Sequence, residues 1–584
     1  MHKEGSMLLA EKRLALMKIE QGDSNAQTCY AAKELKHYLE MITGAVFDIV
    51  TGPVTDSPRI RISRQDELGY DTFTLQTTDA GLDISGGIRG VIYGVYEFLE
   101  KLGCRFFTPL DEKIPVCEDL VLPELSETQK PRLEYRLHNT NDLSRYRRFA
   151  VKSRINGGNI PEKFGSSMKY ALFVHTLETL IPQKLYAESH PEYFPLIDGK
   201  RFLPENPHIN QRCLTNPEVL QIAIENVRKT LLAKPDCRII SISQLDNCTN
   251  CQCEKCLAVD REEGSPAGTL LRFVNAIADA LKDEFPEVIF DTLAYQYTRP
   301  APVKTKPRPN VCVRLCSIEC CFSHPFGKCS DTTRGVEHPD GTRSDFVTDL
   351  RAWGKVCDRL YIWDYVTSFS HYPAPHPNWH TLQPNLQTLV ENNVKGVFEQ
   401  GNSQIGGGPD LVELRQYLIS KLLWDPYCDA EKHITEFLEF YYGAAAPMIR
   451  EYMELVCKKC EDEDIHVGFN DRPKKPFLAE DMLDQYDAIL QRAADAVAGD
   501  ILRSVRVRKV QFCPQYLRLK RKAMLRGETD TAELNAFFTE WRAYGFTRIH
   551  EWVSAETAHQ AFLKGMWRGE ELYNHWMEEG PEEQ

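Results

Sequence analysis

The sequence has neither an excess of basic residues nor a long apolar run, and each absence excludes a broad class of function. Lys and Arg number 70 against 84 Asp and Glu in 584 residues, which gives a net charge of −14. Binding to nucleic-acid phosphates needs a basic surface, so no nucleic-acid partner is expected. No stretch approaches the roughly 18 consecutive apolar residues of a membrane-spanning helix. We therefore expect no membrane span either.

The sequence also lacks an export signal and the common nucleotide-binding motifs. Residues 1–20 contain a short apolar patch and no small-residue cleavage site, which predicts a cytoplasmic protein. A trimmed export signal would leave the same sequence. The glycines at 406–408 have neither the phosphate-loop nor the dinucleotide pattern. Because no export signal is seen, we expect the 19 cysteines to be reduced thiols.

The first part of the chain predicts a small α/β domain over residues 1–125. Apolar residues at helical spacing predict helices over 31–44 and 90–103. Alternating apolar residues predict three strands between them, at 59–63, 72–78 and 81–87. The Pro-rich segment 114–132 is expected to be a linker.

From about residue 130 the pattern changes to strands alternating with helices, which is typical of parallel pairing in a (β/α) barrel or an open sheet. We assign residues 130–425 to this catalytic domain and residues 426–584 to a helical C-terminal region, which serves as scaffold or as the surface of a homo-oligomer. An eighth barrel strand is not obvious, and residues 466–471 are our candidate. The predicted strands begin near residues 133, 238, 288, 311, 359 and 394.

Three of these strands deliver an acidic residue at their C-terminal ends, where such folds keep their chemistry. The acids are Glu319, Asp364 and Glu399. Glycoside hydrolysis needs one carboxyl group to protonate the leaving oxygen and a second to attack or to activate water. A single strand-end acid is more often a helix cap or an arginine partner, but three in one domain favour catalysis. The sequence therefore predicts a glycosidase.

Other residues at the strand ends predict a sugar-binding site. Asp246 and Asn247 follow the strand at 238–247, and their polar side chains suit sugar hydroxyl groups. Tyr295, Trp363 and Tyr365 offer aromatic faces on which sugar rings pack. Aromatic residues are also common in barrel cores, so simple packing is the alternative.

Cysteines follow Asn247 at a spacing that resembles a metal site. Four cysteines within nine residues predict a structural zinc site, although one of their gaps is shorter than usual; they are Cys248, Cys251, Cys253 and Cys256. Free thiols or a redox-dependent bridge are the alternative. A nucleophilic pair of Cys320 or Cys321 with His324 rests on spacing alone. No cofactor is expected to be required for catalysis.

Several long motifs resemble domain-of-unknown-function family 4838, part of which is classified as glycoside hydrolase family 163. The resemblance covers roughly residues 130–430 and is carried, in order, by SQLDNCTNCQCEKC, EEGSPAGTLLRFVNAIADAL, LAYQYTRPAP, VRLCSIECCFSHPF, LYIWDYV, GVFEQG and LLWDP. Residues 1–125 separately resemble the small α/β domain of α-glucuronidases and hexosaminidases, through AAKELKHYLEMITG and SGGIRGVIYGVYEFLEKLGCRFFTP.

The resemblance implies a (β/α)8 TIM-type barrel and an endo-β-N-acetylglucosaminidase-like, retaining glycoside hydrolase acting on N-acetylhexosamine-containing glycans. Carried over, the catalytic pair is Glu319 as acid/base and Glu399 as nucleophile, with Asp364 binding substrate or tuning a glutamate. No adjacent Asp-Glu pair stands at these strand ends, which disfavours assistance by the substrate's own N-acetyl group. The alternatives are a non-catalytic carbohydrate-binding protein, an α-glucuronidase-like exo-glycosidase, and a zinc- or cysteine-dependent enzyme.

Overall fold

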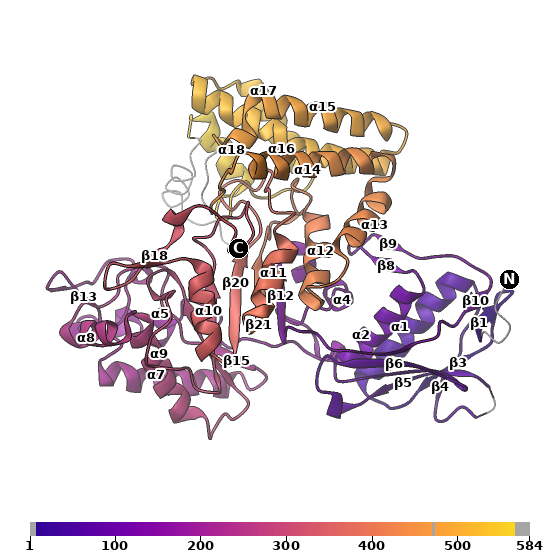
Figure 1. Ribbon diagram of the computed structural model, residues 1–584, viewed down its shortest axis with the longest axis horizontal. Coiled ribbons are helices and arrows are strands. Elements are labelled where there is room, and N and C mark those ends of the chain that lie inside the picture. Colours follow the sequence, from indigo (N-terminus) through magenta and orange to yellow (C-terminus); the bar gives the residue numbers. More distant parts are fainter. Residues whose placement is uncertain (1–6, 56, 470–473, 567–584) are drawn as a thin grey trace. The chain divides into compact units, whose positions relative to one another are not determined.

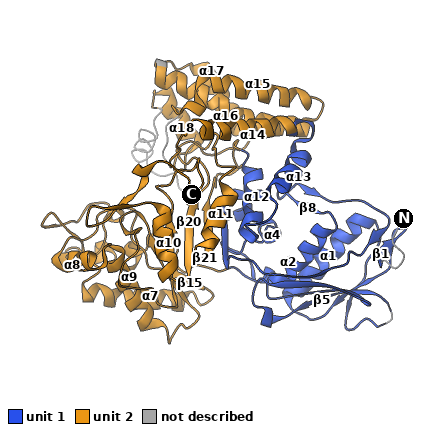
Figure 2. Cartoon of the chain, viewed as in Figure 1, with its two compact units in different colours: residues 1–167, 411–446 blue, residues 168–410, 447–584 orange. Residues whose placement is uncertain are grey.

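The computed structural model describes residues 7–55, 57–469 and 474–566, and they divide into two compact units. Unit 1 comprises residues 1–167 and 411–446, and unit 2 comprises residues 168–410 and 447–584 (Figure 2). The three-domain division at residues 125 and 425 stays a prediction. No helix in the described part of the chain combines the length and the apolar character needed to cross a membrane.

A mixed sheet forms the centre of the first part of unit 1. Its strands follow the order β11-β6-β7-β5-β3-β4, and β6 and β11 are antiparallel to their neighbours. Ile60 and Ile62 alternate with the outward-facing arginines of β5, as the period of a strand requires. The bounds are β3 Lys18–Gln21, β4 Ile49–Thr51, β5 Arg59–Arg64, β6 Phe73–Thr78, β7 Gly81–Gly86 and β11 Ser126–Gln129.

Two helices, α1 (Ala26–Thr43) and α2 (Gly90–Lys101), pack on this sheet and on each other, as predicted (Figure 1). Helix α1 ends at Gly44, which takes a left-handed conformation (φ 69°) and donates its backbone N–H to the carbonyl of Glu40. The expectation of a linker over 114–132 is wrong, because this segment contributes β10 (Leu120–Val121), which pairs with β1 (Leu8–Glu11), and the edge strand β11.

Residues 411–446 return to unit 1 as two helices, α12 (Val412–Trp424) and α13 (Ala430–Tyr442). Arg105 makes a two-point ion pair with Glu436 at 2.7 and 3.0 Å, and Trp424 donates its indole N–H to Gln129 at 3.1 Å. The other elements of unit 1 are β2 Leu14–Ala15, β8 Arg105–Phe106, β9 Glu112–Lys113, β12 Tyr135–Asn139, α3 Asn141–Arg145 and α4 Arg147–Lys152.

Unit 2 contains a parallel sheet in the order β21-β20-β17-β16-β15, with α-helices between successive strands except between β16 and β17, where only a short 3-10 helix occurs. A parallel bridge joins Tyr170 to Ile239 at the β15 side. The strands are β15 Ile239–Ser241, β16 Ile289–Ala294, β17 Val311–Cys316, β20 Leu360–Tyr365 and β21 Val394–Gln400. The helices between them include α8 Glu254–Glu263, α9 Ala267–Leu281, α10 Phe346–Val356 and α11 Leu382–Glu391, and α7 Pro217–Ala233 precedes β15.

The described residues confirm a mixed α/β fold with a parallel sheet, and a full (β/α)8 barrel is not confirmed. Residues 466–469 of the predicted eighth strand are irregular, and residues 470–471 lie outside the described residues. The reason is local: Val467 accepts a hydrogen bond from the Phe322 N–H at 2.8 Å, and its own N–H donates to Ser323 Oγ. Its backbone therefore bonds to a loop rather than to a strand.

Unit 2 also contains the short helices α5 Leu177–Leu180 and α6 Gln183–Tyr186 and two hairpins, β13 Leu196–Ile197 with β14 Lys200–Arg201 and β18 Val336–Glu337 with β19 Arg343–Ser344. Longer helices follow the parallel sheet. They are α14 Ala446–Asp462, α15 Glu480–Ala496, α16 Ile501–Arg526, α17 Thr531–Ala543 and α18 Ala555–Leu563. Within the predicted helical region, α17 ends at Ala543, because Gly545 adopts a positive φ of 77°. Residues 544–553 form an irregular segment. This segment places the carboxyl group of Glu551 beside Gln400, the last residue of β21.

Candidate active site

The carboxyl groups of Asp364 and Glu399 lie side by side at the C-terminal end of the parallel sheet. Asp364 on β20 and Glu399 on β21 are register partners, so the two side chains leave neighbouring strands at the same level. Glu319 comes from the next strand, but not from its last residue as predicted. Strand β17 ends at Cys316, and Glu319 lies in the turn that follows.

Burial and mutual repulsion keep a proton on the Asp364–Glu399 pair. Asp364 is 5% exposed and Glu399 is 2% exposed. Burial raises the pKa of Asp364 to about 6, although Ser317 donates its hydroxyl and Tyr365 its backbone N–H to the carboxylate. Burial, followed by the charge of Asp364, raises the pKa of Glu399 well above its ordinary value. Two adjacent carboxyl groups of this kind share one proton near neutral pH.

Glu399 also has unused hydrogen-bonding capacity. Its Oε2 atom is buried and finds no hydrogen-bond partner among the described residues. A buried polar atom without a partner is costly and rare, and in a site it marks a position that a ligand or water completes.

Glu319 has different surroundings, because a buried guanidinium group faces it. Arg299 Nη1 lies 3.0 Å from Glu319 Oε2, and Arg299 Nε lies 2.8 Å from Asp349 Oδ2. Burial raises the pKa of Glu319, and the charge of Arg299 partly offsets that rise. The side chain of Glu319 is 24% exposed, so it is more accessible than the side chain of Glu399.

Of the predicted substrate-binding residues, Asp246 and Tyr295 are in direct contact. The hydroxyl of Tyr295 donates to Asp246 Oδ1 at 2.9 Å, and Asp246 is exposed while Tyr295 is buried. Burial raises the pKa of Tyr295, with further contributions from the charges of Asp246 and Glu319. These three side chains therefore lie within electrostatic range of one another.

Trp363 and Asn247 have partners within the protein. Trp363 is half-buried, donates its indole N–H to Gln400 Oε1 at 2.8 Å, and stacks on Tyr365 with ring centroids 6.4 Å apart. Asn247 donates to the carbonyl of His208 and accepts from Gln211 and Thr249, so its amide holds the loop after β15 together.

Sequence reasoning missed Arg299 and Glu551. Arg299 is fully buried between two acids, and the motif that contains it, YTRP, carried no signal of that role. Glu551 lies in the irregular segment after α17, where its carboxyl accepts from Gln400 Nε2 at 2.6 Å. Burial raises the pKa of Glu551 to about 7, with a further contribution from the charge of Asp246. No local sequence pattern reports such a contact.

The predicted cysteine cluster forms, but with a different fourth member. Cys213 Sγ lies 3.8 Å from Cys253 Sγ and 3.9 Å from Cys256 Sγ, and Cys251 completes a group whose sulfur atoms all lie within 4.8 Å of one another. Cys248 lies apart: it is exposed and donates to Gln296. In a tetrahedral zinc–cysteine site the sulfur atoms are about 3.8 Å apart, so the cluster containing Cys213 could hold zinc.

The pairing of Cys321 with His324 is also present in the structure. Cys321 Sγ lies 3.3 Å from His324 Nδ1, and Cys329 and His466 lie in the same cluster. Cys320 is not part of this group among the described residues.

Comparison with known proteins identifies one family. A family model described as a domain of unknown function, DUF4838, matches residues 106–454, which is more than half of the chain. No curated protein matches the chain in sequence.

Solved structures resemble the chain only distantly. A glycoside hydrolase family 138 enzyme that targets pectin rhamnogalacturonan II has a TM-score of 0.45 at 10% identity, and the match covers 97% of this chain and 100% of that enzyme's chain. The Clostridium perfringens family 89 glycoside hydrolase has a TM-score of 0.45 at 10% identity, covering 88% and 65%. The Streptomyces plicatus N-acetyl-β-hexosaminidase has a TM-score of 0.42 at 12% identity, covering 75% and 93%. Because the TM-scores are below 0.5 and the identities are 10–12%, these similarities do not indicate the function of this chain.

Proposed function

This chain belongs to the DUF4838 family, and from that premise we propose that it is a glycoside hydrolase. The observation that carries the proposal is the set of acids at one end of the parallel sheet: the proton-sharing pair of Asp364 and Glu399, and Glu319 in the turn that follows β17. Two carboxyl positions with distinct proton affinities are what glycosidic bond cleavage requires.

In this proposal Glu319 is the general acid and base. Burial favours its protonated form, so it can donate a proton to the leaving oxygen. Arg299, 3.0 Å away, then stabilises the carboxylate that remains. The ionised Glu319 can afterwards take a proton from the attacking water, which is the exchange of roles that a retaining reaction needs.

Glu399 is the nucleophile, and Asp364 adjusts its charge. The pair carries one proton, so one negative charge is shared across two oxygen-rich groups held on rigid strands. Approach of a positively charged, oxocarbenium-like sugar would stabilise the carboxylate form of Glu399, and the proton of the pair would pass to Asp364. Asp246, Tyr295, Trp363 and Tyr365 would bind the sugar.

The proposed substrate is a β-linked glycan that contains N-acetylhexosamine. This finer assignment rests on the resemblance of the quoted motifs to the endo-β-N-acetylglucosaminidases of the family. The exposed Asp246 carboxylate beside the hydroxyl of Tyr295 is suited to accept hydrogen bonds from sugar hydroxyl groups.

The test is turnover of a panel of aryl β-glycosides, including the β-N-acetylglucosaminide, and of a complex N-glycan. Wild-type protein would be compared with Glu319→Gln, Glu399→Gln and Asp364→Asn. Glu287→Gln is the matched control, because its carboxyl is 82% exposed and lies 3.7 Å from Arg238 at the opposite end of β16. We expect a loss of about 10²-fold or more in the first two variants.

Two outcomes would separate the alternatives. Turnover that survives both glutamate substitutions would overturn the site. Binding of a glycan without turnover, unchanged in Glu319→Gln, would favour a carbohydrate-binding protein instead. The anomeric configuration of the first product, followed by NMR, distinguishes retention from inversion.

A further inference from the structure

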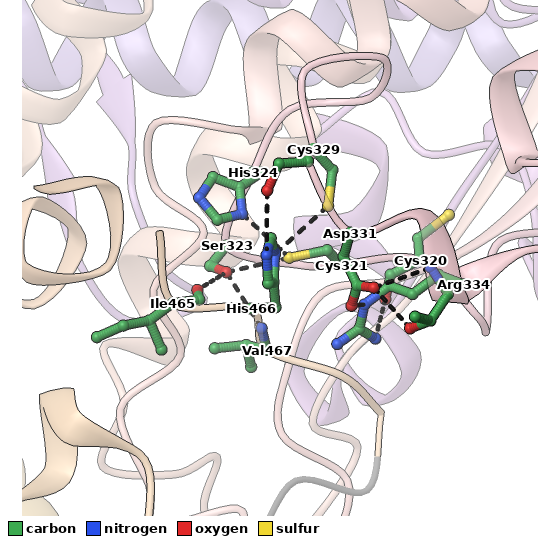
Figure 3. Close-up of polar contacts among 12 residues, drawn as sticks. Cys320, Cys321, Ser323, His324, Cys329, Asp331, Arg334, Ile465, His466 and Val467 are labelled. Atoms are coloured by element: carbon green, nitrogen blue, oxygen red, sulfur yellow. Dashed lines mark hydrogen bonds and ion pairs between the residues drawn. The ribbon is translucent and has the colours of Figure 1, made fainter. Parts of the chain in front are cut away.

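A second cluster of metal-ligating side chains lies in the loop that follows β17. It consists of Cys321, His324, Cys329 and His466, and the four side chains point toward one another (Figure 3). One sulfur or nitrogen atom from each lies within 4.8 Å of all the others. Three members come from a single loop, and His466 comes from the segment after α14.

The distances fit a tetrahedral zinc site. Cys321 Sγ lies 3.3 Å from His324 Nδ1, and Cys329 Sγ lies 3.4 Å from His466 Nδ1. With Zn–S bonds of about 2.3 Å and Zn–N bonds of about 2.0 Å, neighbouring ligand atoms in a tetrahedron lie about 3.3–3.8 Å apart. Two thiols and two imidazoles are also the donor set that selects zinc among the common divalent ions.

The second nitrogen of each imidazole faces a carboxylate. His324 Nε2 lies 3.4 Å from Asp464 Oδ1, and His466 Nε2 lies 3.3 Å from Ser330 Oγ and 3.7 Å from Asp464 Oδ2. Ser330 donates its hydroxyl to Asp464 Oδ2 at 2.5 Å and fixes that carboxylate in place. Histidines that bind a metal through one nitrogen typically donate the other N–H to such a group, which orients the ring. A shared carboxylate behind both rings is independent support for a metal between them.

Backbone contacts already hold the two segments of the cluster together. The Phe322 N–H donates to the Val467 carbonyl at 2.8 Å, and Ser323 Oγ donates to the Ile465 carbonyl at 2.6 Å. The ligand atoms therefore belong to a preformed arrangement rather than to freely moving side chains.

We infer that Cys321, His324, Cys329 and His466 bind a structural Zn²⁺ ion. Four protein ligands fill a tetrahedral site and leave no position for substrate, so this zinc takes no part in catalysis. It fixes the loop that follows β17, in which Glu319 lies two residues before Cys321. Cys321 and His324 are thus metal ligands rather than a nucleophile and its base.

The experiment is zinc analysis of the full-length protein by mass spectrometry, after extensive dialysis. Loss of about one equivalent is expected in His466→Ala and in Cys329→Ser. Cys253→Ser serves to count metal held by the separate cluster of Cys213, Cys251, Cys253 and Cys256. Cys237→Ser is the matched control, because this buried cysteine lies outside both clusters. Unchanged zinc content in both ligand variants would overturn the inference.

A milder substitution tests the same inference without removing a metal ligand, so that misfolding does not confuse the result. The side chain of Asp464 is 59% exposed, so Asp464→Ala should fold. It is expected to weaken zinc affinity about 10–100-fold, measured by competition with a chromogenic chelator. The absorption of cobalt-loaded wild-type protein minus that of cobalt-loaded Cys329→Ser should show the bands of a tetrahedral site with two thiolates; a difference spectrum without thiolate bands would contradict the site. These readouts do not depend on turnover, so they stand even if the proposed glycosidase activity fails.

Discussion

In unit 1 the buried carboxyl of Asp71 lies between two guanidinium groups, whereas in unit 2 the buried carboxyl of Glu399 lies beside another carboxyl. Arg89 Nε is 2.5 Å from Asp71 Oδ1, and Arg136 Nη2 is 3.2 Å from Asp71 Oδ2. Burial alone would raise the pKa of Asp71, but the two arginines outweigh it and lower the pKa. For Glu399 burial and the neighbouring Asp364 act in the same direction and raise it.

The difference separates acids whose pKa arginines lower, which hold the fold together, from acids whose pKa stays raised, which are available for chemistry. Glu97 repeats the unit 1 arrangement: although burial would raise its pKa, Arg154 at 2.5 Å brings it down to about 2. Asp364 and Glu551 repeat the unit 2 arrangement, with pKa values raised to about 6 and about 7. Strongly raised carboxyl pKa values without a cationic partner are characteristic of functional sites.

The largest effect should come from Glu399→Gln. We expect kcat to fall by about 10²–10⁴-fold, because the nucleophile is lost, while the unfolding temperature stays the same or rises. The rise would reflect removal of a buried group that repels Asp364. Turnover and thermal unfolding of the same preparation check this. If Glu399→Gln lowered the unfolding temperature as much as the loss of a unit 1 ion pair does, the two sets of acids would not differ in their effect on stability.

Asp71→Asn should have the next largest effect, and it should act on stability alone. The change leaves the charges of Arg89 and Arg136 buried without their partner, which is expected to cost about 3–5 kcal/mol of unfolding free energy. Urea denaturation measures the loss. Activity per folded molecule should be unchanged, and a specific loss of kcat would contradict a purely structural role.

The two sets of acids should also respond to pH in opposite directions. The pKa of Glu551 is raised from 4.5 to about 7 on folding, so the folded state binds more protons in that window and the unfolding free energy falls as pH rises through it. The pKa of Glu97 is lowered from 4.5 to about 2, so its contribution to stability is lost as pH falls from about 4.5 to about 2.

Glu551→Gln isolates the first of these contributions. Between about pH 5 and pH 8 the fall in unfolding free energy should shrink by roughly 1–3 kcal/mol, because glutamine does not ionise. Urea unfolding of both proteins at the two pH values provides the measurement. An identical pH dependence in the variant would show that Glu551 does not carry the raised pKa.

The smallest effect should come from an exposed ion pair, which belongs to neither set. Arg492 Nη2 lies 2.6 Å from Glu451 Oε1, and both side chains are about half exposed. Because water screens such pairs, Arg492→Ala should change the unfolding free energy by less than about 1 kcal/mol. A larger loss would mean that burial is not what distinguishes the acids compared above.

Local patterns in the sequence were sufficient to predict most elements of the two sheets. The apolar runs that predicted strands near residues 311, 359 and 394 correspond to β17, β20 and β21. Gly44 was recognised as the end of α1, because a left-handed residue at a helix end has a clear sequence signature. The end of β17 was predicted too late, because the apolar pattern continues past Cys316, and Glu319 lies in the turn beyond it.

Contacts between distant segments could not be predicted in this way. Cys213 replaces Cys248 in the cysteine cluster because a fourth ligand 40 residues from Cys253 leaves no spacing pattern. His466 lies 137 residues from Cys329, and Glu551 reaches Gln400 from a segment whose apolar periodicity predicted a helix. These positions follow from tertiary packing, so the candidate catalytic acids were visible in the sequence while their electrostatic partners were not.

Unit 1 is built from two stretches of chain, and this constrains how the protein is made. Residues 1–167 leave the ribosome first, but α12 and α13 in residues 411–446 complete the unit. About 280 residues are added after residue 167 before residue 446 is reached, which takes roughly 14–56 s at about 5–20 residues per second. During that interval Arg105 and Gln129 lack the partners Glu436 and Trp424. The N-terminal stretch therefore stays incompletely packed while the strands that carry the proposed catalytic acids are already emerging.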